Sequence, residues 1–204
     1  MIMYLFETMR LEAGKIPRYV YHQARLFNSA EQLGYPLTKE TFERFIQSIQ
    51  QAYPTGTHRL KVMLEPSGTL TYQCVTLPNK SHFTAKAQQI NTDYPKWQYI
   101  NKTSHREHVE HNHETDVVLY YDNKGKVLEF DIGNVLIKEN EHYYTPPFEN
   151  DFLRGCMRAQ LLDEGKAKEK DYDISELKRK LKAGEAEIFL VNSLREVAEI
   201  EINL

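Results

Sequence analysis

The stretch DVVLYYDNKGKVLEFDIGNVLI, residues 116–137, contains the pattern that decides the fold of the second half of the chain. Two apolar segments flank the triplet Asn-Lys-Gly at 123–125, which is typical of the turn in a β-hairpin. A second turn, Ile-Gly-Asn at 132–134, precedes another apolar segment. The stretch therefore predicts two antiparallel strands and the start of a third.

Two features of this stretch could also bind a ligand. Glu129 is an acidic residue inside an otherwise apolar strand. The turn of Ile132, Gly133 and Asn134 could point its backbone N–H groups together at an anion. An edge-strand glutamate and a purely structural turn explain the same residues, so both alternatives stay open at this point.

Helical and strand patterns continue on both sides of this stretch. They give one order of elements, with a linker in the middle that contains at most one strand. The expected elements are a hairpin at 5–19, helices at 20–35 and 36–53, a hairpin at 58–77, the linker at 78–98, a helical turn in the histidine-rich segment, strand pairs at 116–130 and 133–146, helices at 149–165 and 174–184, and terminal strands at 187–193 and 196–203. Helices and antiparallel strands in both halves predict an α+β protein of two domains, at residues 1–95 and 99–204.

The composition excludes several classes of protein. The chain has 204 residues, of which 41% are hydrophobic and 27% charged, with a net charge of -3. Its apolar runs are far shorter than the ~20 residues that cross a bilayer, and its scattered basic residues form no stripe for nucleic acid. The two cysteines are far apart and show no metal-binding or disulfide spacing. These features predict a cytoplasmic protein with reduced thiols.

The segment YINKTSHREHVEHNHETD, residues 99–116, contains four histidines, at positions 105, 108, 111 and 113. On a helix, His105, His108 and His111 could share a face, and imidazole is a common zinc ligand. However, this spacing drifts around the helix, and no acidic or cysteine partner has a recognised spacing. The favoured interpretation is the exposed polar surface of a helix, with no metal bound.

Lys102 lies at the start of the same segment, after the apolar and aromatic residues Trp97, Tyr99 and Ile100. Partial burial would lower its pKa toward the range in which a neutral amine attacks carbonyl groups. Most of the 26 basic residues of the chain must be surface charges, so the position alone is weak support for a catalytic role.

Five motifs in order resemble the fold-type IV pyridoxal-phosphate enzymes, also called class IV aminotransferases, which include branched-chain and D-amino acid aminotransferases and aminodeoxychorismate lyase. The motifs cover nearly the whole chain. They are LFETMRLEAGKIPRYVYHQARL, NKTSHRE, VLEFDIGNVLI followed by YYTPP, GCMRAQLL, and EIFLVNSLREV.

The resemblance implies a role for several residues. Lys102, followed by Arg106, matches the lysine that holds pyridoxal 5′-phosphate as a Schiff base and moves a proton at the substrate α-carbon. Glu129 matches the carboxylate that pairs with the pyridine nitrogen. Arg25 matches the arginine that binds the cofactor phosphate. The remaining matches are backbone phosphate contacts of Ile132 and Gly133, a phosphate contact of Ser193, and structural supports at Asn134 and Arg158.

The resemblance also implies the two-domain fold of D-amino acid aminotransferase, with a sandwich-like α/β N-terminal domain and a mixed, barrel-like C-terminal domain, and a homodimer. The expected reaction is either amino transfer to a 2-keto acid or elimination of pyruvate from aminodeoxychorismate. Glu7 occupies a position at which some lyases have a threonine and aminotransferases often have a glutamate, so this residue slightly favours transamination. Family members usually have a further strand pair before the segment that starts at Leu5, so a non-catalytic binding protein of the same fold is the alternative.

Overall fold

The computed structural model describes residues 2–111 and 113–203. Its contacts divide the chain into two compact units, and each is described by itself. The first contains residues 1–79 and 101–105, and the second contains residues 80–100 and 106–204. The division lies before the predicted boundary at 95–99. It differs because a strand in the predicted linker joins the second sheet, while the short segment that carries Lys102 pairs with the first.

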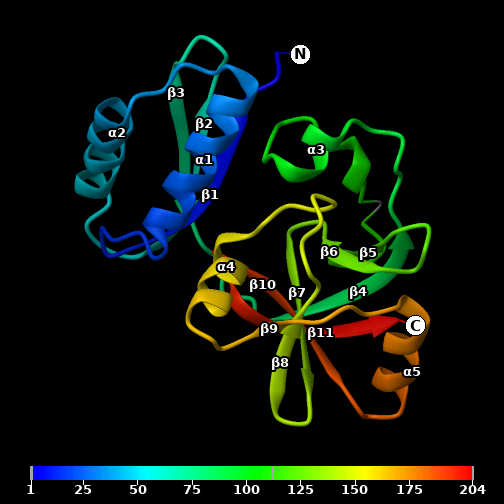
Figure 1. Cartoon of the computed structure of the whole chain (residues 1–204). Helices are drawn as coiled ribbons and strands as arrows, with labels where there is room; N and C mark the ends of the chain where they lie inside the picture. Colours follow the sequence, from blue (N-terminus) through cyan, green and yellow to red (C-terminus); the bar gives the residue numbers. More distant parts are fainter. Residues whose placement is uncertain (1, 112, 204) are drawn as a thin grey trace. The chain divides into compact units, whose positions relative to one another are not determined.

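The first unit is a three-stranded antiparallel sheet covered on one face by two helices (Figure 1). The strand order is β1-β2-β3, and the sheet forms because alternate residues of β1 and β2 are apolar and pack against both helices. The elements are β1 (Leu5–Glu12), α1 (Tyr19–Leu33), α2 (Lys39–Ala52), β2 (Thr57–Leu64) and β3 (Leu70–Thr76).

Both helices form where the sequence predicted them, and local signals set their ends. Gly34 ends α1 with a φ of 73°, a left-handed conformation that glycine adopts without strain. The side chain of Thr38 accepts a hydrogen bond from the backbone N–H of Thr41 and begins α2. The hairpin of β2 and β3 is also confirmed.

The hairpin predicted at residues 5–19 is wrong. The turn at Ala13 and Gly14 forms, but the returning chain makes only a single bridge between Lys15 and Glu12. β1 pairs instead along its whole length with β2, from Leu5 opposite Leu64 to Glu12 opposite Thr57. The long-range partner wins because it adds a complete ladder and buries the apolar face of β1.

The second unit contains an eight-stranded sheet that closes on itself (Figure 1). The order is β10-β11-β4-β5-β6-β7-β8-β9, and β10 also pairs with β7, which closes a ring of strands. The strands are β4 (His82–Gln89), β5 (Val117–Tyr121), β6 (Val127–Phe130), β7 (Gly133–Glu139), β8 (His142–Thr145), β9 (Lys168–Glu169), β10 (Glu187–Asn192) and β11 (Glu196–Asn203). The barrel-like C-terminal domain is therefore confirmed, as is the α+β class.

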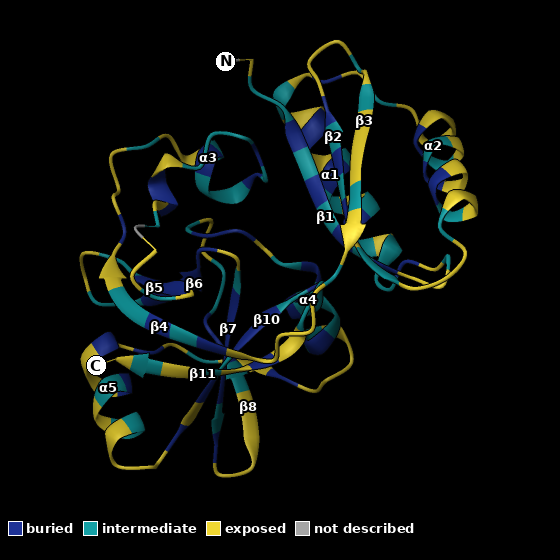
Figure 2. Cartoon of the chain, turned by 180° about the vertical axis from the view of Figure 1, so that it is seen from behind, coloured by how far each residue is buried: buried dark blue, intermediate teal, exposed yellow. Residues whose placement is uncertain are grey.

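The helices of the second unit are short and lie outside this ring. They are α3 (Lys96–Ile100), α4 (Cys156–Asp163), α5 (Ile174–Lys182) and the 3-10 helix η1 (Glu107–Val109). Strand β5 is apolar throughout because both of its faces are covered: Val117 and Leu119 belong to the core inside the ring, and Val118 and Tyr120 to a second core outside it. Figure 2 shows β5 and β6 almost wholly buried.

The structure has the one strand that the sequence allowed in the linker and a helical turn in the histidine segment, and it adds a short helix that the sequence did not predict. The linker contains β4, which pairs in parallel with both β5 and β11. It also contains α3. The helical turn predicted in the histidine segment is present as η1, which is the only helical element of that segment among the described residues. No helix in the described part of the chain is long and apolar enough to cross a membrane.

Candidate functional site

The first unit holds Arg25 in a buried ionic cluster between β1 and α1. Alternate side chains of a strand share a face, so Glu7 lies on the same buried face of β1 as Leu5 and Met9, toward the helices. Arg25 donates from Nε to Oε1 of Glu7 at 2.8 Å and from Nη2 to Oε2 at 2.6 Å. Nδ1 of His22 lies 2.6 Å from the same Oε2. The guanidinium of Arg25 is therefore fixed by two parallel hydrogen bonds.

The charges of this cluster stabilise one another. Burial by itself raises the pKa of Glu7, but Arg25 and His22 outweigh burial and lower that pKa from its usual 4.5 to about 2. Burial lowers the pKa of His22, so its ring is neutral at pH 7 and donates from Nδ1 to the carboxylate. Glu7 is thus an ionised carboxylate engaged by two partners, and its oxygens hold Arg25 in one orientation.

The segment that carries Lys102 is held by backbone contacts at the edge of β1 that does not pair with β2. The backbone N–H of Phe6 donates to the carbonyl of Lys102 at 2.9 Å, and Thr103 forms a bridge with Leu5. Nζ of Lys102 lies 4.8 Å from the centroid of the Phe6 ring, and Nζ of Lys61 lies 4.6 Å from the same ring. The segment of Lys102 thus extends the first sheet at the outer edge of β1, and the Phe6 ring lies near the amine of Lys102.

In the second unit, Glu129 and Asn134 hold one loop. Glu129 lies on β6 with 2% of its surface exposed, and its Oε1 accepts a hydrogen bond from the backbone N–H of Leu153 at 3.3 Å. Asn134 donates to the carbonyl of Leu153 at 2.9 Å and accepts from the N–H of Gly155 at 2.8 Å. Arg158 is buried and donates to the carbonyl of Pro146. Asn134 and Arg158 thus both bond to backbone groups of neighbouring loops.

Two turns of the second unit lie together, and Asn192 joins them. Its Nδ2 donates to the carbonyl of Ile132 at 3.2 Å, and its Oδ1 accepts from the N–H groups of Leu194 and Arg195 at 3.0 and 2.8 Å. A Cβ on Gly133 would lie 2.6 Å from the carbonyl oxygen of Val191, so only glycine allows this approach. The turns bring Ile132 and Gly133 close to the chain at Ser193.

Sequence reasoning missed Asn192 and the start of α4. The signal for Asn192 is its place before Ser193 at the end of an apolar strand, where an asparagine side chain bonds the backbone two and three residues on. The signal for α4 is the glycine in GCMR: Gly155 is the N-cap, and its Cβ position is occupied by Oδ1 of Asn134. Asn192 and Gly155 both act by fixing the course of the backbone, and a search for catalytic or ligand-binding side chains does not reveal such residues.

The histidines of residues 105–113 are in different environments, which contradicts the expected exposed helix face. His108 is 2% exposed and its ring lies 4.9 Å from that of Tyr99. His111 contacts Asp131 and the carbonyl of Thr115. His113 is exposed. The segment is irregular because these side chains pack against different elements, and no shared helix face exists.

His108 is expected to weaken the fold in acid. Neither ring nitrogen has a hydrogen-bond partner, and burial together with Arg106 lowers its pKa from its usual 6.5 to about 4. The unfolded chain therefore binds the proton more tightly, so the free energy of unfolding falls as pH decreases from 6.5 to 4, by up to about 3 kcal/mol. Urea unfolding at pH 7 and pH 4.5 measures this loss. His108→Phe should reduce it, and the exposed His142→Phe should not; equal losses in both variants would contradict the prediction.

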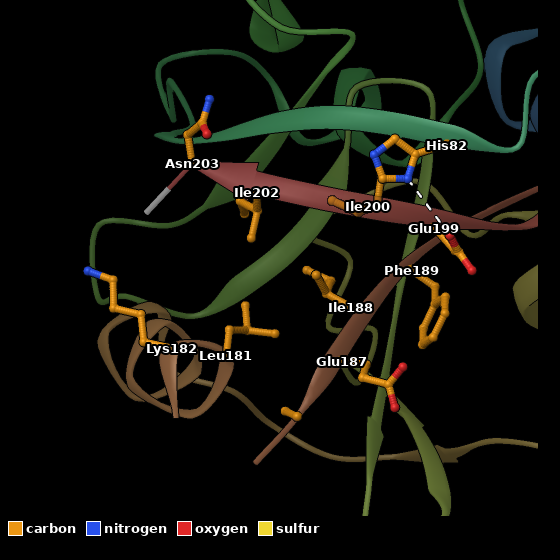
Figure 3. A pocket seen from close by; sticks show the side chains of 11 residues that line it. His82, Leu181, Lys182, Glu187, Ile188, Phe189, Glu199, Ile200, Ile202 and Asn203 are labelled. Atoms are coloured by element: carbon orange, nitrogen blue, oxygen red, sulfur yellow. Dashed lines mark ion pairs between the residues drawn. The ribbon is translucent and has the colours of Figure 1, made fainter. Parts of the chain in front are cut away.

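A cavity of about 560 Å³ in the second unit contains none of the predicted site residues. Its wall is mainly Leu181 of α5 and apolar residues of β10 and β11, with His82 and Glu199 at one side (Figure 3). The candidate site residues of this unit lie on β6 and on the turns described above, and none of them lines this cavity.

The chain is similar to proteins of known sequence along nearly its whole length. A family model described as "Amino-transferase class IV" matches residues 4–202. A Schizosaccharomyces pombe protein named "Putative aminodeoxychorismate lyase" is 30% identical over 208 aligned residues, which cover 96% of this chain and 87% of that protein.

Solved structures share the fold. A Mesorhizobium loti protein described as a "Putative amino-acid aminotransferase" is 26% identical, with a TM-score of 0.83 over 98% of this chain and 100% of that one. A Mycobacterium tuberculosis structure described as a hypothetical aminotransferase in its PLP-bound form is 18% identical, with a TM-score of 0.80 over 98% of this chain and 81% of that one. The second likeness shows the fold alone.

Proposed function

The chain belongs to the class IV aminotransferase family, and from this premise we propose that it is an enzyme that binds pyridoxal 5′-phosphate through a Schiff base at Lys102. The observation that carries the proposal is the buried carboxylate of Glu129 on β6, the strand that leads into the turn of Ile132 and Gly133. This turn lies beside the turn that contains Ser193. When bound, the cofactor supplies an electron sink for negative charge at the substrate α-carbon.

The residues of the first unit fit two parts of this cofactor. Arg25 would bind the phosphate, because Glu7 fixes its guanidinium in one orientation and a guanidinium fork matches phosphate oxygens. Lys102 would attach covalently through Nζ and, when released, move a proton at the substrate α-carbon. The aromatic ring of Phe6 beside Nζ limits the positions that this amine can take.

The residues of the second unit fit the remaining parts. Glu129 would accept a hydrogen bond from the protonated pyridine nitrogen, a role suited to a carboxylate held away from water. The backbone of Ile132 and Gly133 and the side chain of Ser193 would donate to the phosphate. Asn192 supports this role because it ties both turns together.

We favour elimination of pyruvate from aminodeoxychorismate over amino transfer. The named lyase relative supports this choice. The presence of Glu7 in place of threonine favoured transamination in the sequence analysis. In the structure, however, both carboxylate oxygens of Glu7 bond to Arg25 and His22. Glu7 therefore acts by orienting Arg25, a role compatible with either reaction. We further propose that the enzyme is a homodimer, as the family resemblance implies, and cytoplasmic, as its composition and cysteine spacing predict; light scattering and cell fractionation would test these two points.

The test of this function is the visible spectrum followed by two product assays. Purified protein titrated with pyridoxal 5′-phosphate should develop an absorption band that the free cofactor lacks, and the loaded enzyme should release pyruvate from aminodeoxychorismate with no keto acid present. Activity that instead requires an amino acid and a keto acid such as 2-oxoglutarate would identify a transaminase. A spectrum identical to the sum of protein and free cofactor would overturn the proposal and favour the non-catalytic alternative.

A further inference from the structure

The histidine-rich segment contacts the turn before Gly133 at two points within the second unit. Arg106 donates from Nη2 to the backbone carbonyl of Asp131 at 3.0 Å. Nδ1 of His111 lies 3.1 Å from Oδ2 of Asp131, and its Nε2 lies 2.7 Å from the carbonyl oxygen of Thr115. Asp131 is thus held through both its main chain and its side chain.

Asp131 is also fixed to the neighbouring strand. Its Oδ1 accepts from the N–H of Val118 at 2.9 Å, and its own N–H donates to the carbonyl of Val118 at 3.1 Å. Only 8% of Asp131 is exposed, whereas Ile132, the next residue, is 48% exposed. The ordered core of the unit therefore ends at Asp131, and the surface turn begins there.

The contact between His111 and Asp131 requires a proton. The carbonyl of Thr115 can only accept, so Nε2 of His111 carries a hydrogen. Two lone pairs facing each other at 3.1 Å would repel, so one further proton lies between Nδ1 and Oδ2. Burial raises the pKa of Asp131, while the adjacent His111 and Arg106 oppose that effect. In either arrangement of the proton, the two side chains form a hydrogen bond in a mostly buried place.

We propose that His111 is a positioning residue for phosphate binding: with Arg106 it braces Asp131, and so fixes the direction of the backbone of Ile132 and Gly133. This inference rests on the proposed function, which assigns these backbone groups to the cofactor phosphate. It gives the histidine-rich segment a use that needs no metal and no helix face. Arg106 bonds to the main-chain carbonyl of Asp131 and restricts its backbone, whereas His111 bonds to the carboxylate and restricts its side chain.

The test compares pyridoxal 5′-phosphate with pyridoxal, which lacks the phosphate. His111→Phe keeps a ring and removes both hydrogen bonds. We expect it to weaken binding of the phosphorylated aldehyde by ~10-fold, the effect of about one hydrogen bond, and to leave binding of pyridoxal unchanged. Both affinities are read from absorption titrations. The exposed His142→Phe in the same unit is the matched control and should change neither affinity.

Two further variants separate the contact to Asp131 from the contact to Thr115. In His111→Asn the amide nitrogen occupies the place of Nδ1 and can donate to Asp131. In His111→Gln it occupies the place of Nε2 and reaches Thr115 instead. The asparagine variant should retain most of the preference for the phosphorylated aldehyde, and the glutamine variant should lose it. This pair decides the matter even where His111→Phe folds poorly.

Equal losses of both aldehydes in His111→Phe, or better retention by glutamine than by asparagine, would show an ordinary structural role and overturn the inference. Wild-type preference in all three variants would overturn it too, with the proposed function intact. Wild-type protein that binds neither aldehyde would overturn the proposed function and this inference together.

Discussion

Lys102→Ala is expected to abolish covalent binding of pyridoxal 5′-phosphate and to lower turnover at least ~10³-fold, because one side chain would supply both the covalent link and the proton transfer. After borohydride reduction, mass spectrometry of wild-type protein should find the cofactor on the peptide that contains Lys102. The variant should have no such adduct. Its thermal unfolding should change little, because the backbone contacts of this residue with Phe6 remain.

Lys61→Ala is the matched control for covalent attachment. Lys61 lies in the same unit, and its Nζ is as close to the ring of Phe6 as that of Lys102, at 4.6 and 4.8 Å. Loss of this lysine should leave the adduct on Lys102 in place. An adduct found on Lys61, or one that persists in Lys102→Ala, would contradict the assignment of Lys102.

Glu7→Gln is expected to lower the free energy of unfolding by about 3 kcal/mol at pH 7. Removal of one partner from a buried ion pair leaves the other charge uncompensated, and here Arg25 would keep its charge while His22 loses its carboxylate acceptor. Urea unfolding measures the change. Glu12→Gln is the control, because Glu12 pairs with Arg10 on the same strand but at an exposed position, and its effect should be much smaller.

The effect of Glu7→Gln should depend on pH. The folded-state pKa of Glu7 is lowered to about 2, so the stabilisation by the carboxylate is complete above pH 4.5 and is lost as pH falls toward 2. The difference in unfolding free energy between wild type and variant should therefore be largest near pH 7 and smaller at pH 3. A difference that is constant over this range would show that the charge of Glu7 does not stabilise the fold.

Several elements with local signals were predicted correctly. Gly34 and Thr38 mark the ends of α1 and α2 because their own conformation and hydrogen bonds set those ends. The turn at 123–125 and the apolar strands around it predicted β5 and β6. The failed hairpin at residues 5–19 had the same kind of local signal, but a partner some fifty residues away, β2, pairs better with β1. Sequence patterns measure local preference and not the competition between partners.

The histidine segment shows the same limit for side chains. His108 and His111 are identical residues in a polar segment, yet one lies buried against Tyr99 and the other bonds Asp131. Tyr99 precedes the histidines and Asp131 follows β6, so the spacing of the histidines relative to one another had no information about these contacts. Sequence spacing likewise did not reveal that partners on α1 bond to the carboxylate of Glu7.

The sequence by itself determined the α+β class, the family, and the residues that carry its motifs, because these depend on local periodicity and on residue types in a fixed order. Only the tertiary structure decided that β4 belongs to the closed sheet, that the segment of Lys102 pairs with β1, and that Glu7 fixes Arg25. Such contacts join residues far apart in the chain, and their stability comes from burial and charge pairing that exist only in the folded state.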